Sequence, residues 1–212
     1  MPVAPVIALS HGGGPLPILG DKNHESIVYS LKNRVPKILG LGTPSAPRAI
    51  VLVTAHWSTA VPTVSSAARH DLYYDYSGFP SESYALKYPA PGDPPIAREI
   101  KALLDADGLR ARLDPNRGWD HGVFIPMLLV NPAADVPIVQ VSVLADDRWS
   151  ALRAWRTLPH ANQMHPPRAG EHFMPLLVCA GAAGDGEKAG VYKDVYSGVD
   201  ILTYYWGAPQ VD

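Results

Sequence analysis

The chain has 212 residues, of which 47% are hydrophobic and 18% charged, and its formal net charge is −2. This length fits one domain with a sizeable core, and the balanced charge excludes the strongly basic surface of a typical nucleic-acid binder or membrane anchor. No apolar stretch approaches the length of a membrane span, and no signal-peptide pattern opens the chain. A lone cysteine, Cys179, cannot form a disulfide framework, so we expect a cytoplasmic protein in a reducing compartment.

Strand and helix patterns alternate along the chain. In chain order, apolar and β-branched runs predict strands at 3–10, 48–54, 110–113, 136–144 and 197–207. Helical spacing and capping signals predict helices at 24–39, 94–107, 122–130 and 171–183. Residues 68–93, rich in Tyr, Pro and Gly, predict a long ordered excursion. This alternation predicts the α/β class: a compact single domain over residues 1–212, with a mainly parallel or mixed central sheet flanked by helices.

Two predicted strands are followed closely by a histidine: the run VIALS leads to His11, and the run VLVTA leads to His56. Ligands of open α/β sheets bind beyond the carboxyl ends of the strands. Neutral imidazole binds Fe, Zn, Cu and Ni, so this placement favours a metal site. An isolated histidine more often has a structural role, but two in matching positions weigh against it. The glycines after His11 lack the Lys-Ser/Thr of a phosphate-binding loop, and we expect them to let backbone pass close to a bound group.

Two further segments supply candidates for the same site. In WDHGVFIPM, His121 opens an apolar helix. Asp120 either orients an imidazole or binds the metal through its carboxylate, or it is the N-cap of that helix. In MHPPRAGEHFMPLLV, Glu171 and His172 lie at a helix start, where either can complete a three-ligand face, and His165 precedes them. Two histidines with a carboxylate suit non-heme Fe(II), and three histidines suit catalytic zinc. Surface or structural roles are assigned to His24, His70 and His160.

Five stretches carry a family resemblance: LSHGGGPLPILGD, RAIVLVTAHWS, HDLYYDYSGFPSESYALKYPAPGDP, RGWDHGVFIPMLLVNPAADVPIVQVSVL and EHFMPLLVCAGAAGD. In this order, and over nearly the whole chain, they resemble the class III extradiol ring-cleavage dioxygenases of the DOPA 4,5-dioxygenase type. The resemblance implies an α/β fold, one divalent metal ion, Fe(II) or Zn(II), and a small aromatic diol and O2 as reactants. It implies metal ligands at His11, His56 and His172, and it makes His121 an active-site histidine that contacts substrate or oxygen.

The chain departs from that family after the run IVQVSVL. There the family continues through a helix and a strand to a GSG-x-S-x-HN-like motif with a further active-site histidine, either the catalytic base or a further metal contact. No Ser-x-His-Asn occurs here. The resemblance therefore predicts that a helix–strand segment of several tens of residues is absent near 145–148, which leaves either an open sheet edge or a gap in the core. Loss of a catalytic base slows proton transfer by ~100- to ~10,000-fold. We hypothesise that His165 or His160 replaces it, because both follow the gap.

Three functions follow from these patterns. The first is a metal-dependent extradiol dioxygenase that opens the ring of a DOPA-like catechol with O2, impaired by the missing segment. The second is a metal-binding form of the same fold that has lost catalysis. The third is a zinc-dependent hydrolase in which His11, His56 and His172 activate water. Dependence on oxygen separates the first from the third.

Overall fold

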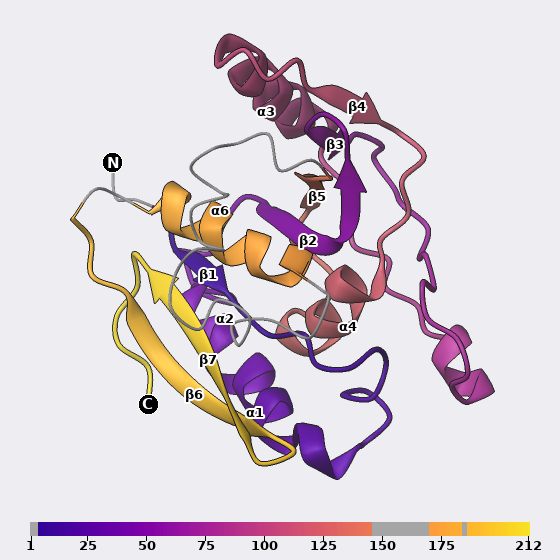
Figure 1. Cartoon of the computed structure of the whole chain (residues 1–212), viewed down its shortest axis with the longest axis vertical. Coiled ribbons are helices and arrows are strands. Elements are labelled where there is room, and N and C mark those ends of the chain that lie inside the picture. Colours follow the sequence, from indigo (N-terminus) through magenta and orange to yellow (C-terminus); the bar gives the residue numbers. More distant parts are fainter. Residues whose placement is uncertain (1–3, 146–169, 184–185) are drawn as a thin grey trace.

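The computed structural model describes residues 4–145, 170–183 and 186–212, and Figure 1 shows the arrangement of its elements. The strands are β1 (Val6–Ala8), β2 (Ile50–Thr59), β3 (Thr63–Ser65), β4 (Arg112–Asp114), β5 (Ile138–Leu144), β6 (Gly190–Tyr196) and β7 (Val199–Trp206). The α-helices are α1 (Glu25–Asn33), α2 (Val35–Ile38), α3 (Pro94–Ala106), α4 (His121–Val130) and α6 (Met174–Ala182). The 3-10 helices are η1 (Lys22–His24), η2 (Ser81–Tyr84) and η5 (Gly170–Phe173). The predicted α/β class is confirmed, while β3 and β6 have no counterpart among the predicted strands.

The described strands form two sheets. In the four-stranded sheet, with the order β2-β5-β3-β4, β2 runs parallel to β5 and β3 runs parallel to β4, whereas β3 and β5 are antiparallel. The second sheet, with the order β1-β7-β6, is antiparallel throughout. The expected mixed sheet is therefore present, and the carboxy-terminal strands form a separate antiparallel sheet beside it. In Figure 1 the β6–β7 pair lies beside α1, and α6 contacts both β1 and β2.

A tight hairpin explains the second sheet. Ser197 and Gly198 join β6 to β7 with φ angles of 48° and 79°. Positive φ at both central residues gives a turn that matches the twist of paired strands. The other edge of β7 pairs with β1, with Ile7 opposite Tyr205. The strand that leads to His11 is therefore held by the carboxy-terminal hairpin.

The helices follow local signals, with one exception. The predicted helix at 24–39 is split at Arg34 into α1 and α2, because Pro36 has no N–H to continue the hydrogen-bond pattern of α1. In contrast, α3 begins and ends as predicted. The side chain of Asp93 accepts a hydrogen bond from the backbone N–H of Ile96 at 2.9 Å, and Gly108 follows the helix with a φ of 80°.

The main core surrounds α4. Val123, Phe124 and Ile125 are fully buried, as are Trp119 just before this helix and Ile138 of β5. Apolar residues cover every side of α4, and a helix of this kind is buried on all sides. The start of α4, with His121, is thus anchored in the main hydrophobic core. None of the helices that the structure describes is both long and apolar enough to cross a membrane.

Candidate metal centre

His11 lies in a loop just beyond β1, and a buried histidine shapes this loop. The backbone N–H of Gly13 donates to Nε2 of His24 at 2.9 Å, and Nδ1 of His24 lies 2.5 Å from Oδ2 of Asp21. Gly12 has a φ of +79°, and a Cβ atom there would lie 2.7 Å from Cδ2 of His24. The structural role assigned to His24 is confirmed. Glycine is required at position 12 by its positive φ and by the approach of His24, while the expected passage of backbone close to a bound group stays a prediction.

His56 lies inside β2, and not beyond its end as expected. The pairing of β2 with β5 shifts register between Thr54 and Ser58, so His56 and its two neighbours bulge out of the ladder. Such bulges re-aim side chains and occur next to active sites. The predicted strand at 48–54 therefore continues to Thr59, and the histidine is turned outward at the point where regular pairing is interrupted.

The carboxylate of Asp120 fastens this bulge. It is fully buried and accepts hydrogen bonds from Thr54 Oγ1 at 2.8 Å, Gln140 Nε2 at 2.7 Å, Arg117 Nη2 at 2.8 Å and the backbone N–H of Gly122 at 3.0 Å. The last bond makes Asp120 the N-cap of α4. Of the roles left open for Asp120, the N-cap is therefore confirmed. Within the described residues, none of its hydrogen bonds goes to an imidazole.

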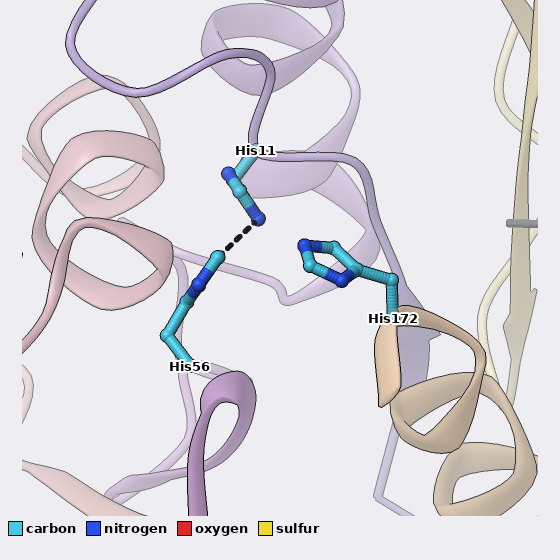
Figure 2. A group of neighbouring side chains, drawn as sticks. All are labelled: His11, His56 and His172. Carbon is cyan, nitrogen blue, oxygen red and sulfur yellow. Dashed lines mark hydrogen bonds between the residues drawn. The ribbon is translucent and has the colours of Figure 1, made fainter. Parts of the chain in front are cut away.

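Three histidines from separate elements point toward one another in Figure 2. The ligand nitrogens of His11, His56 and His172 all lie within 4.8 Å of one another, and the Nε2 atoms of His11 and His56 are 3.1 Å apart. His172 comes from η5, and its Nδ1 lies 3.3 Å from Oε1 of Glu171. Of the two residues that could complete the face, the structure brings His172 into the cluster and leaves Glu171 beside it. The side chains of His56 and His172 are 18% and 29% exposed, so small molecules can reach the cluster.

His121 joins the cluster from the first turn of α4. Its ring centroid lies 4.1 Å from that of His56 and 5.0 Å from that of His11. Its Nδ1 and its backbone N–H both face Oδ1 of Asp75, at 2.8 and 2.9 Å. The other oxygen of Asp75 lies 3.9 Å from Nδ1 of His56.

Asp75 is a site residue that sequence reasoning missed. It is 46 positions from His121 and lies outside regular secondary structure, so no periodicity or capping pattern connects the two residues. The only available signal was its place in YYDYSGFP, within one of the stretches that carry the family resemblance.

The electrostatics favour uncharged imidazoles beside an ionised carboxylate. Burial lowers the pKa of His11 well below its usual value of 6.5, and the neighbouring His121 and His56 lower it further. Burial and His121 also lower the pKa of His56. Burial acts to raise the pKa of Asp75, but the side-chain and backbone hydrogen bonds from His121 outweigh it, so this pKa is lowered. Neutral imidazole is the form that binds a metal ion.

The spacing of His11 and His56 suits two ligands of one divalent ion, and His172 offers a third imidazole nitrogen within 4.8 Å of theirs. Imidazole nitrogens lie about 2.0–2.1 Å from zinc, so two such ligands are about 2.9–3.4 Å apart in tetrahedral or octahedral geometry. The 3.1 Å between the Nε2 atoms of His11 and His56 falls in this range. A second group, His56 with Asp75 and His121, is equally compact. In this second group Nδ1 of His121 and Oδ1 of Asp75 are hydrogen-bonded at 2.8 Å, closer than the 3.1 Å between His11 and His56.

The other candidates lie apart from this cluster. His70 faces the carbonyl oxygens of Arg117 and Ala67, at 2.9 and 3.1 Å, and its predicted structural role is confirmed. His160 and His165 are outside the described residues, so the catalytic role of His165 stays a prediction. The thiol of Cys179 donates to the carbonyl oxygen of Ile7 at 3.4 Å, and burial raises its pKa to about 11.

Three clustered histidines on an α/β scaffold, with a fourth histidine beside them, are an arrangement typical of non-heme, metal-dependent enzymes. Residues 5–152 match the family described as the catalytic LigB subunit of aromatic ring-opening dioxygenase. The chain belongs to this family of ring-opening dioxygenases, and the resemblance seen in its sequence is confirmed.

Curated relatives agree with this assignment. The chain is 48% identical over 285 residues to "Dioxygenase tasH" of Hapsidospora irregularis, covering 100% of this chain and 88% of the relative. It is 35% identical over 136 residues to a 4,5-DOPA dioxygenase extradiol of Beta vulgaris, covering 64% of this chain and 48% of the relative. A protein of the same name from Escherichia coli (strain K12) is 35% identical over 140 residues, covering 66% of this chain and 47% of the relative. The chain thus spans about half the length of these last two proteins.

A solved structure has the same fold. The uncharacterized protein JW3007 from Escherichia coli K12 superimposes with a TM-score of 0.55 over 84% of this chain and 91% of that chain, at 21% sequence identity. At this level of identity the likeness supports the fold alone.

Proposed function

We propose that this chain opens the ring of a DOPA-like catechol with O2, at a bond next to the diol, with one divalent metal ion held by His11, His56 and His172. The observation that carries the proposal is the approach of these three imidazoles to within 4.8 Å of one another. The name of the relatives from Beta vulgaris and Escherichia coli, 4,5-DOPA dioxygenase extradiol, supports an aromatic diol as the substrate. When bound, the ion, Fe(II) or Zn(II), supplies Lewis acidity and, as Fe(II), the redox chemistry that O2 requires.

His121 is the proposed general base. Its ring lies beside those of His56 and His11, so a catechol bound at the cluster brings a hydroxyl close to this imidazole. Removal of a hydroxyl proton makes the ring more electron-rich and readier to react with oxygen. A positioned base of this kind contributes ~100- to ~10,000-fold to the rate.

We also propose that this single domain lacks an internal helix–strand segment near 145–148. The alignment with the Hapsidospora dioxygenase extends over 285 positions, which is 73 more than the 212 residues of this chain (285 − 212 = 73). The match to the family ends at residue 152, close to the proposed gap. His165 or His160, which follow the gap, would then supply the missing histidine as a second proton-transferring group in addition to His121. Undiminished turnover in the His160→Ala, His165→Ala double variant would exclude this role.

We also propose a cytoplasmic location, because Cys179 is a free thiol and a reducing compartment keeps thiols free.

The function is tested by oxygen consumption. The purified chain is loaded with Fe(II) without oxygen, and O2 uptake is measured with L-DOPA and with simpler catechols, while the optical spectrum is followed for a yellow ring-opened product. His11→Ala serves as the blank, after circular dichroism has shown that it is folded. We expect uptake and product from the wild-type chain and neither from the blank.

The two alternatives give different results in the same assay. A folded, metal-loaded wild-type chain without O2 uptake would be a form that kept the metal site and lost catalysis, which the absent segment favours. Hydrolysis of ester substrates by the zinc-loaded chain, with no need for oxygen, would show a hydrolase instead.

A further inference from the structure

We infer that Asp75 is a positioning residue that holds His121 with its proton on Nδ1, so that Nε2 is the free nitrogen that faces the reaction. This inference rests on the proposed function, in which His121 is the base. Asp75 itself is expected to contact neither substrate nor metal ion.

The hydrogen bonds select one form of the ring. A carboxylate only accepts hydrogen bonds, and neutral imidazole carries one N–H. Oδ1 of Asp75 lies 2.8 Å from Nδ1 of His121, which makes Nδ1 the ring nitrogen placed to donate to this carboxylate. Nε2 then keeps its lone pair on the opposite side of the ring and has no hydrogen-bond partner among the described residues. An unprotonated nitrogen beside the histidine cluster is what a general base requires.

The same carboxylate also fixes where the ring lies. Oδ1 of Asp75 accepts the backbone N–H of His121 at 2.9 Å in addition to the ring N–H. Through this pair of hydrogen bonds the carboxylate of Asp75 holds both the backbone and the ring of His121, the first residue of α4. The side chains of Asp75 and His121 are only 12% and 11% exposed, so water competes weakly for these bonds.

Asp75 is in turn held by its neighbours. The hydroxyl of Tyr74 donates to the carbonyl oxygen of Leu86 at 2.7 Å, and that of Tyr76 donates to the carbonyl oxygen of Ser83 at 2.6 Å. The backbone N–H of Tyr73 donates to the carbonyl oxygen of Trp119 at 2.7 Å. The segment that carries Asp75 is thus fastened directly to the segment that carries His121. Such support keeps an active-site imidazole in one orientation.

The direct test is nuclear magnetic resonance of the full chain with ¹⁵N-labelled histidine and added Zn(II), in which long-range ¹H–¹⁵N couplings show which ring nitrogen carries the proton. The signals of His121 are assigned by their loss in His121→Asn. We expect His121 to be protonated on Nδ1 in the wild-type chain and to shift toward protonation on Nε2 in Asp75→Ala. Asp75→Asn keeps an oxygen acceptor and should retain more of the Nδ1–H form. Asp71→Ala, an exposed position in the same segment, should leave the spectrum of His121 unchanged.

The kinetic test uses the same variants loaded with Fe(II). We expect Asp75→Ala to lower kcat by ~10- to ~100-fold, the effect typical of residues that orient active-site side chains through hydrogen bonds. The KM for the catechol and the metal content should change less than about twofold, and Asp75→Asn should recover part of kcat. A merely structural role would lower the amount of folded, metal-loaded protein and leave kcat per metal ion unchanged.

The two tests separate failure of this inference from failure of the proposed function. Protonation of His121 on Nε2 in the wild-type chain, or the same spectrum in Asp75→Ala, would overturn the role of Asp75 even if the enzyme cleaves catechols. If the chain gives the expected spectra but consumes no O2, the positioning of His121 by Asp75 is confirmed and only the proposed dioxygenase function fails.

Discussion

Gly122 of α4 and His56 of β2 are in contact, and only glycine permits this approach. A Cβ atom on Gly122 would lie 2.8 Å from Cδ2 of His56 and 2.9 Å from Oγ1 of Thr54. Separations below 3.0 Å force one of the partners to move. The close packing of a helix start on a strand bulge therefore holds one of the proposed metal ligands in place.

Gly122→Ala should weaken metal binding, because the added methyl group displaces the His56 ring from its present position beside His11. We expect the affinity for Zn(II) to fall by ~10- to ~100-fold, the usual effect of disturbing the support of a ligand. A competition titration against a chromophoric chelator measures this affinity. Gly181→Ala is the matched control: Gly181 lies in α6 with nothing within 4 Å of its would-be Cβ, and alanine should stabilise the helix there by about 1 kcal/mol. Equal affinity in the two variants would contradict the steric account.

Asp120→Ala should be far more destabilising than an ordinary loss of an N-cap. Asp120 is fully buried, and its removal leaves Arg117, Gln140 and Thr54 without their acceptor. Breaking a buried charged pair costs about 3–5 kcal/mol. Asp93→Ala removes the N-cap of α3 alone and should cost about 1 kcal/mol. Urea unfolding of the two variants compares these costs, and equal values would mean that the network around Asp120 adds nothing to the cap.

The metal-free protein should lose stability in mild acid. The pKa values of His11 and His56 are lowered in the folded state, so below pH about 6.5 the unfolded chain binds protons that the folded chain does not. The free energy of unfolding should then fall as the pH drops through this region and remain level above it.

The variant His11→Gln has no titrating group at this position. The slope of its stability against pH should be smaller by up to about 1.4 kcal/mol per pH unit, the contribution of one proton. Urea unfolding in chelator-treated buffers between pH 5 and 8 measures both slopes. Parallel curves for wild type and variant would show that His11 titrates alike in the folded and unfolded chain.

Cys179 should resist alkylation in the folded protein. Burial raises its pKa to about 11, so very little thiolate is present at neutral pH, and the thiol is bonded to the carbonyl oxygen of Ile7. Mass spectrometry after treatment with iodoacetamide at pH 7.5 should find the thiol unmodified, and fully modified when urea is added. Rapid alkylation without urea would mean that α6 separates readily from β1.

Much of the site can be predicted from the sequence, because the patterns that mark its residues span only a few positions each. The strand runs mark His11 and His56, and the helix start marks Glu171 and His172, of which the family resemblance selects His172; the fold brings His11, His56 and His172 together. The helix α3 follows from the cap at Asp93 and the glycine after it, since capping acts over only a few residues.

The tertiary structure alone decided how those parts meet. The bulge that turns His56 outward arises from pairing between β2 and β5, strands far apart in the sequence. The second sheet arises because β7 pairs with β1 at the other end of the chain. Asp75 reaches His121 across 46 positions, and Gly122 reaches His56 across two elements. Caps, turns and periodicity reflect the backbone within a few residues, whereas contacts of this kind depend on which distant surfaces pack together, and that is settled only when the whole chain folds.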